Sequence, residues 1–167
     1  MPRLLGAAVL AFAVAGLAGC GFRPLYGDVA GAVTAEELAA VDINLIANRE
    51  GQIVRNRLLT RMQPRGPVLP ARYQLDVDLR ESRMGLAVQR DETATRTNIT
   101  VTADVVLTDL ATGEIGLVQS VSSYASYDTL TAEYATLSAE RDARERALRD
   151  LADRIATLVA LYLQRTG

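Results

Sequence analysis

The chain has 167 residues, with 18 Lys plus Arg, 20 Asp plus Glu and a formal net charge of −2. That length suits one domain with a sizeable core, and the balanced charge argues against general nucleic-acid binding. The sequence holds no His and one Cys, which excludes Ser-His, Cys-His and His-based metal sites. Because it also lacks a glycine-rich phosphate loop and a calcium loop, we expect no metal and no cofactor.

Residues 1–19 are predicted to form a secretory signal peptide. Arg3, an apolar run from Leu4 to Leu17 and the small residues after it supply the three parts of such a signal. The run is about 15 residues long, which is too short to cross a hydrocarbon core of ~30 Å as a helix. We therefore expect this segment to be removed during export.

The end of this segment, Leu17-Ala18-Gly19-Cys20, resembles the bacterial lipobox. In that motif the chain is cleaved before the cysteine, here between Gly19 and Cys20, and the cysteine then carries three acyl chains. Each buried CH₂ group contributes ~0.8 kcal/mol, so three chains would anchor the protein durably to a membrane. An ordinary signal peptide with a coincidental cysteine is the alternative, but the only cysteine of the chain lies at the lipobox position.

Residues 20–40 are predicted to be a lipidated N-terminus and a linker. Phe22 and Tyr26 follow the anchor closely, and their rings suit either the bilayer interface or a docking contact with the protein's body or a partner. The small and polar stretch 28–40 fits a loop or a single helical turn, with a capping box at 34–37.

The next stretch predicts a strand followed by a helix. Residues 41–46 alternate between apolar and polar side chains, which is typical of a half-buried strand. Its inward side chains would be Val41, Ile43 and Leu45. Residues 49–62 carry apolar side chains at four-residue spacing, so we expect a helix with one buried face. That face would consist of Val54, Leu58 and Met62.

Three strand-like runs come next. The first covers residues 73–80 and can continue past Ser82 to Val88, with Gly85 as a bulge or bend. The second is predicted to bury Ile99, Val101, Ala103, Val105 and Leu107. The third, residues 115–127, alternates poorly, so the sequence leaves its buried face open. A turn at 109–114 joins the last two runs as an antiparallel hairpin.

Residues 131–164 change to helical periodicity. Charged pairs with the acid on the N-terminal side lie beside one apolar stripe, which consists of Leu148, Leu151, Ile155, Leu158, Val159 and Tyr162. The pairs are Glu140/Arg144, Asp142/Arg146, Glu145/Arg149 and Asp150/Arg154, each contributing ~0.2–0.5 kcal/mol. This charged surface is either solvated or a partner-binding face.

The element order is therefore β-α-β-β-β-α, within one domain at residues 41–167. Apolar faces of a sheet and of two helices can be buried only against one another. We expect an α+β two-layer sandwich with two helices on one face of a four-stranded mixed sheet. The opposite sheet face would be polar, carrying Gln74, Asp76, Arg96, Asn98 and Thr100.

Two motifs now point to a family. The lipobox is followed by Gly-Phe-Arg-Pro-Leu-Tyr-Gly at 21–27, and Arg-x-Gly-Gln-x-x-Arg-Asn-x-Leu occupies 49–58. Together with the element order, these segments resemble the LPS-assembly lipoprotein family LptE in its alphaproteobacterial form. The resemblance implies a non-catalytic plug and assembly partner of the LptD β-barrel that contacts lipopolysaccharide (LPS). Gly21 after the anchor is similar to lipoproteins sorted to the outer membrane.

Three arginines are candidate LPS contacts. Arg83, Arg90 and Arg96 cluster in the sequence around the connection between the first two long strands. Guanidinium groups bind phosphate through charge-assisted hydrogen bonds, and lipid A carries phosphates. Arginines at an exposed strand end are the alternative explanation, since no family motif aligns with these positions.

Two other classes of function remain open. The first is a periplasm-facing lipoprotein that binds another envelope protein as an inhibitor or chaperone. The second is a hydrolase that uses two carboxylates. Asp76 and Asp78 are better explained as the solvated face of a strand, so we expect no enzymatic activity.

Overall fold

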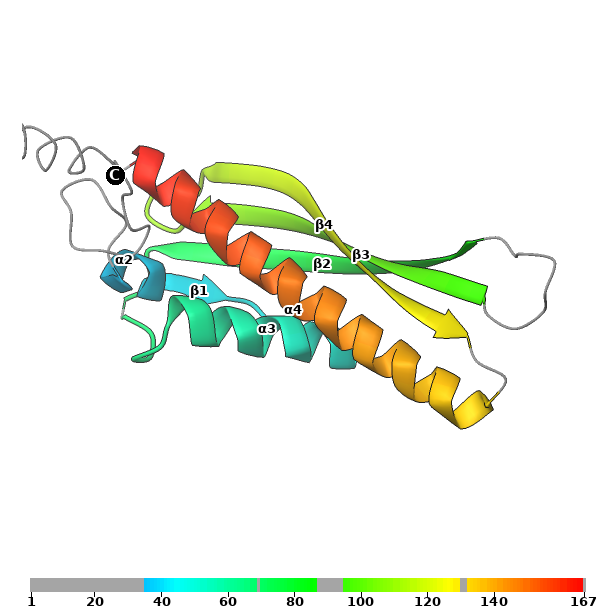
Figure 1. Ribbon diagram of the computed structural model, residues 1–167. Helices are drawn as coiled ribbons and strands as arrows, with labels where there is room; N and C mark the ends of the chain where they lie inside the picture. Colours follow the sequence, from blue (N-terminus) through cyan, green and yellow to red (C-terminus); the bar gives the residue numbers. More distant parts are fainter. Residues whose placement is uncertain (1–34, 69, 87–94, 130–131, 167) are drawn as a thin grey trace, which may run out of the picture.

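The computed structural model describes residues 35–68, 70–86, 95–129 and 132–166. Figure 1 labels the elements, which follow one another along the chain as two short elements, a helix, three long strands and a long helix. They are α2 (Ala35–Ala39), β1 (Val41–Ile43), α3 (Asn48–Met62), β2 (Tyr73–Leu86), β3 (Thr95–Asp109), β4 (Ile115–Thr129) and α4 (Glu133–Thr166).

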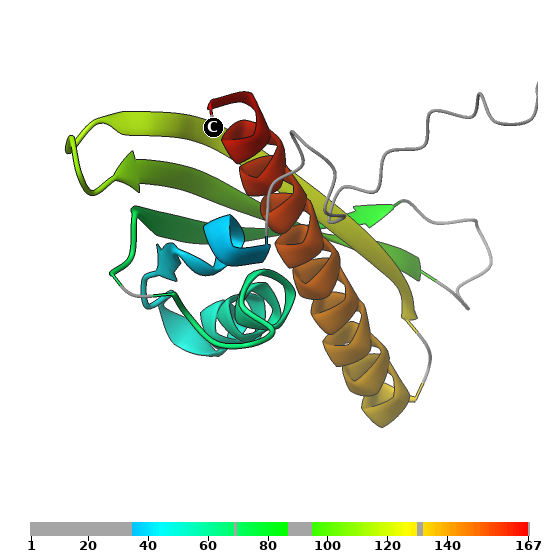
Figure 2. The same ribbon diagram turned by 90° about the vertical axis from the view of Figure 1, so that its left-hand side faces the viewer.

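The four strands form one mixed sheet in the order β1-β2-β3-β4. β1 runs parallel to β2, while β2, β3 and β4 are antiparallel neighbours. Figures 1 and 2 show α3 and α4 on the same side of this sheet, with α4 lying diagonally across it. The predicted α+β two-layer sandwich is confirmed, with α2 as an additional single turn.

The core lies between the sheet and the two long helices. The predicted inward residues of β3, from Ile99 to Leu107, are each at most 2% exposed. From the helices, the predicted face of α3 and most of the predicted stripe of α4 are equally buried. The buried side chains of these helices include Val54, Leu58, Met62, Leu148, Leu151, Ile155 and Val159. Periodicity thus predicted most of the buried positions of β3, α3 and α4.

The first strand is shorter than predicted. Val41 and Ile43 are buried, but Leu45 is 89% exposed, so its predicted inward position is wrong. Pairing with β2 ends after Ile43, because the chain then turns toward α3 and loses the strand alternation. Ile46 is 7% exposed and packs into the core instead.

Gly85 does not form a bulge. β2 extends to Leu86 in unbroken register with β3, and Gly85 lies opposite Thr97. The irregularity of the sheet is between β3 and β4, at Leu107/Thr108. There Gly116 is the extra residue, and the hydroxyl group of Tyr162 on α4 occupies the space that a side chain would need.

The buried face of β4, which the sequence left open, is the one that contains Ser123. This side chain is 1% exposed, and its hydroxyl group donates a 2.7 Å hydrogen bond to Oδ2 of Asp150 on α4. Leu117, Val121 and Ala125 share that face and pack against the core. The alternation is weak because the inward face also carries the polar Ser123, which α4 satisfies, and Gln119. In addition, Val118 and Tyr124 lie on the outward face.

Residues 35–40 adopt the helical alternative. Leu38 and Ala39 of α2 are buried, so this turn belongs to the packed body. The predicted capping residue Thr34 lies outside the described residues, as do the signal peptide and the lipobox.

Candidate functional site

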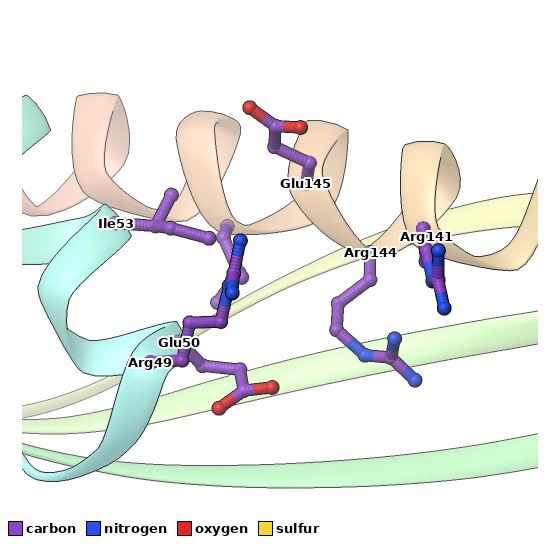
Figure 3. A pocket seen from close by; sticks show the side chains of 7 residues that line it. Arg49, Glu50, Ile53, Arg141, Arg144 and Glu145 are labelled. Carbon is purple, nitrogen blue, oxygen red and sulfur yellow. The ribbon is translucent and has the colours of Figure 1, made fainter. Parts of the chain in front are cut away.

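A concave site opens between the first turn of α3 and the N-terminal half of α4 (Figure 3). It has a volume of about 500 Å³. A neighbouring hollow of about 470 Å³ extends from it toward β2, and the two share Glu50, Arg144 and Leu148. The first pocket is lined by Arg49, Glu50, Ile53, Arg141, Arg144, Glu145 and Leu148.

A tight corner before α3 positions the near wall of this pocket. Asn48 has φ = 67°, a left-handed conformation that asparagine tolerates better than most residues. Gly51 then lies so close to the preceding corner that an ideal Cβ would be 2.6 Å from the carbonyl oxygen of Ile46. Only glycine fits there, which explains the glycine in the motif at 49–58. The corner therefore fixes the backbone positions from which the side chains of Arg49 and Glu50 extend.

An ion-pair cluster forms the far wall and joins α4 to β2. Nε of Arg144 donates to Oε2 of Glu81 at 2.8 Å, and its Nη2 donates to Oε1 of Glu140 at 2.6 Å. Arg83 completes the cluster, with Nε 3.0 Å from Oε1 of Glu81 and Nη1 3.0 Å from Oε1 of Glu140. Each carboxylate therefore contacts both guanidinium groups, and the four charges cancel.

The cluster shifts the titration of its members. Partial burial alone would raise the pKa of Glu81, but hydrogen bonds from Arg144 and Arg83 outweigh burial and hold that pKa below its usual value. The hydrogen bond to Glu81 likewise raises the pKa of Arg144 above its usual value, in spite of partial burial. Both groups therefore stay charged, and the cluster is a fixed feature of the pocket wall.

A second ion-pair group holds the two helices together beyond the pocket. Arg57 on α3 makes a bidentate pair with Asp153 on α4, with both N–O distances at 2.9 Å. Nε of Arg61 lies 3.2 Å from the same carboxylate. The relative position of α3 and α4 is thus set at two points, by packing under the pocket and by this pair.

Two arginines of the pocket have no such partner. Among the described residues, neither Arg49 nor Arg141 forms an ion pair, and both side chains are exposed. Figure 3 shows Arg49 reaching from α3 toward α4, and Arg141 and Arg144 extending from α4 on the side of that helix that faces the strands. Glu145 projects away from the strands in the same view and pairs with Arg149.

The structure separates the predicted arginines. Arg83 faces the helices and belongs to the ion-pair cluster, whereas Arg96 lies on the opposite face of the sheet and pairs with Asp128 at 3.2 Å. Odd and even positions of paired strands point to opposite faces, which is why closeness in the sequence misled. Arg90, Gly19 and Cys20 lie outside the described residues.

Sequence reasoning overlooked the pocket because its residues come from distant segments. One signal was present: Arg144 lies four residues before Leu148, Leu148 three before Leu151, and Leu151 four before Ile155. Arg144 therefore occupies a position of the buried stripe of α4, where a charged side chain needs a partner. No comparable signal marks Arg49 or Arg141.

Within the described ranges, no group of three or more His, Cys, Asp or Glu side chains could hold a metal ion. The helices of that part of the chain also include none long and apolar enough to cross a membrane.

Comparison with known proteins decides the family. The family model described as LptE, lipopolysaccharide-assembly, matches residues 38–159, which span α2 to most of α4 and include every residue of the pocket. The chain belongs to the LptE family. The LptE match supports a role in lipopolysaccharide assembly and cell-envelope biogenesis. No curated protein sequence matches the chain.

Solved structures of lipoproteins are similar to the chain. A putative lipoprotein from Caulobacter crescentus CB15 is similar, with a TM-score of 0.61 and 23% identity over 80% of this chain and 96% of the other. The rare lipoprotein B from Shewanella oneidensis is more distant, with a TM-score of 0.46 and 12% identity over 76% of this chain and 98% of the other. The Caulobacter structure supports the two-layer architecture of this LptE member.

Proposed function

We propose that this LptE member is an outer-membrane lipoprotein, anchored through Cys20, that binds an LptD-type β-barrel and helps it assemble LPS at the cell surface. It acts by binding and catalyses no reaction. The observation that carries the proposal is the polarity of both outer faces of the body, combined with the family's role in LPS assembly.

On one side, the sheet face that α3 and α4 leave uncovered (Figure 2) is mainly polar, with Val118 and Tyr124 exposed on it. Several of its polar side chains pair with one another. Arg80 pairs with Asp104, Arg96 pairs with Asp128, and the hydroxyl group of Ser126 donates to Asn98 at 2.6 Å. All four predicted charged pairs of α4 form, and three of them lie on its exposed side: Asp142/Arg146, Glu145/Arg149 and Asp150/Arg154. A body with two polar outer faces suits the polar lumen of a large β-barrel.

The lipid anchor has a direct test. We expect Cys20→Ala to abolish acylation and to release the protein from the membrane fraction, because it removes the proposed attachment point of the acyl chains. Fractionation of cells and the intact mass of the purified protein measure this. A Cys20→Ala protein that stays in outer-membrane vesicles at the wild-type level would contradict the proposed anchor.

The barrel partnership is tested by purifying the tagged protein from solubilised outer membranes and identifying what co-elutes. We expect a large β-barrel in a constant ratio to the tagged chain. Co-elution of a different envelope protein, with no barrel, would favour the alternative of an inhibitor- or chaperone-like lipoprotein.

Photo-crosslinking distinguishes a plug from a partner that docks beside the barrel. A plug is surrounded, so crosslinkers at Ser122 on the uncovered sheet face and at Arg149 on the exposed face of α4 should both capture the barrel. Leu151 is fully buried, and a crosslinker there serves as the negative control. Capture from only one face would contradict the plug arrangement.

Arg90 and Arg96 remain proposed LPS contacts, independent of the plug. If they are, Arg90→Ala and Arg96→Ala should weaken LPS binding, and unchanged affinity would remove them. Arg83 is held by two carboxylates and is a weaker candidate.

A further inference from the structure

A small cavity, the α2 cavity, lies between α2 and the loop that follows α3, at the point where the described chain begins. It has a volume of about 220 Å³. Sites for small molecules usually need roughly 300–1,000 Å³, so this cavity has room for one side chain rather than for a separate ligand. Its lining consists of Ala35, Glu36, Ala39, Pro64, Arg65, Gly66, Pro67 and Val68.

The loop side of the α2 cavity is a stiff, preformed wall. Pro64 and Pro67 each fix their own φ angle, and Gly66 between them has φ = 93°. The backbone N–H of Val68 donates a 2.9 Å hydrogen bond to the carbonyl oxygen of Ala39, which ties the loop to α2. The side chain of Val68 is nevertheless 40% exposed. An occupant would therefore cover apolar surface without having to order the wall first.

Two opposite charges at the rim of this cavity are unused. Glu36 and Arg65 both line it, and within the part of the chain that the structure describes neither forms an ion pair. The adjoining segment 20–34 carries one charge of each sign, at Arg23 and Asp28. The charges of that segment therefore complement the charges of the rim.

The same segment offers an aromatic side chain within reach of the cavity. Tyr26 precedes Ala35 by nine positions, so the chain between them can extend to about 30 Å. Gly27 and Gly31 lie in this stretch, and their conformational freedom lets the chain turn back toward the body. A tyrosine suits the edge of such a cavity, because its ring is apolar and its hydroxyl group can meet a polar partner at the rim.

We propose that residues 20–34 fold back onto the body, with the ring of Tyr26 in the α2 cavity and the carboxylate of Asp28 paired with Arg65. The occupant is thus a segment of the chain itself. The proposal rests on the cavity, the unused charges and the length of the segment, and it does not depend on the proposed partnership with a β-barrel.

Docking would shorten the tether between the anchor and the body. From Cys20 to a docked Tyr26 the chain spans at most about 20 Å, whereas from Cys20 to Ala35 it can span about 50 Å. The end of the body that carries α2 is then held close to the membrane surface. This consequence rests on the proposed acylation of Cys20, but the docking itself does not.

Cleavage by chymotrypsin, which cuts after aromatic residues, tests the docking. The substrate is the full protein purified from membranes in detergent, and intact mass follows the cut between Tyr26 and Gly27. A synthetic peptide of residues 21–34 is the undocked reference. We expect the protein to be cut at least about tenfold more slowly than the peptide, because a docked tyrosine is cleaved only after it leaves the cavity. Arg65→Asp and Val68→Asp should each speed the cut about threefold or more, since they weaken the docked state.

Exchanging the two charges provides the sharpest comparison. Asp28→Arg alone should speed the cut, whereas Asp28→Arg/Arg65→Asp restores the opposite charges, keeps the net charge and should return the rate to within about twofold of the wild type. Arg149→Asp is the matched control for Arg65→Asp. It makes the same change in net charge on the exposed side of α4, away from the cavity, and screening should leave the rate within about twofold of the wild type. Thermal unfolding followed by circular dichroism confirms that each variant is folded.

Three results would overturn the proposal. The first is a wild-type protein that is cut as fast as the peptide. The second is a slow cut that Arg65→Asp and Val68→Asp leave unchanged, because a detergent micelle around the anchor would shield every variant equally. The third is a charge exchange that fails to restore the slow cut. Intact mass reports acylation separately, so an unacylated chain would contradict the proposed anchor without affecting the test of docking.

Discussion

Replacing Gly51 with alanine is expected to destabilise the folded protein by about 2 kcal/mol, although alanine ordinarily favours a helix by up to ~1 kcal/mol over glycine. The physical reason is the backbone of Ile46, whose carbonyl oxygen would lie 2.6 Å from the new Cβ. Unlike a side chain, this backbone cannot rotate away, so the corner before α3 must move. Urea unfolding of the purified protein measures the change.

Gly85→Ala is the matched control for that variant. Gly85 lies within β2, and nothing is within 4 Å of a Cβ built at this position. We expect a neutral or slightly stabilising effect, because alanine restricts the unfolded chain more than glycine does. Equal stability of the Gly51→Ala and Gly85→Ala proteins would contradict the tight packing at the corner.

Replacing Arg144 with methionine is expected to cost about 1–3 kcal/mol at neutral pH, because it leaves two partly buried carboxylates with Arg83 as their one remaining partner in the cluster. The side chains of Arg144, Glu81 and Glu140 are only 18%, 24% and 17% exposed. Methionine replaces the aliphatic stem of arginine with an unbranched apolar side chain and keeps most of its apolar contacts, so the loss reports mainly on the ion pairs.

The cost should depend on pH in a defined direction. The pKa of Glu81 is 4.5 in its unperturbed form and is lower in the folded protein. The cluster therefore contributes its full stability above about pH 4.5 and loses it as the pH falls through the lowered pKa. We expect the difference in unfolding free energy between wild type and Arg144→Met to be largest near neutrality and to shrink in acid.

Arg149→Met provides the comparison on the same helix. Arg149 also pairs with a glutamate four residues before it, but these two side chains are 57% and 46% exposed. We expect a loss of at most ~0.5 kcal/mol, as for other exposed pairs on helices. A loss as large as that of Arg144→Met, or a cost for Arg144→Met that is unchanged between neutral and acidic pH, would show that the cluster is not the source of the stability.

The sequence by itself determined the architecture. Residues 73–80 and 99–107 have a period of two, and residues 49–62 and 131–164 have a helical period. Each pattern predicts a buried face, and those faces form the core of the structure. The pairs along α4 were equally predictable, because residues four apart on a helix are always neighbours. Local spacing suffices wherever the partner lies within the same element.

Tertiary structure alone decided the rest. Periodicity wrongly predicted that Leu45 is buried, since the strand ends at Ile43, where its pairing with β2 ends. It also did not predict the buried face of β4, where α4 satisfies the inward Ser123. The pocket is lined by Arg49 from one helix and by Arg141 and Arg144 from the other. The register of the sheet places Arg83 and Arg96 on opposite faces. These relations depend on how distant segments pack against each other, and the spacing within any single segment carries no information about that packing.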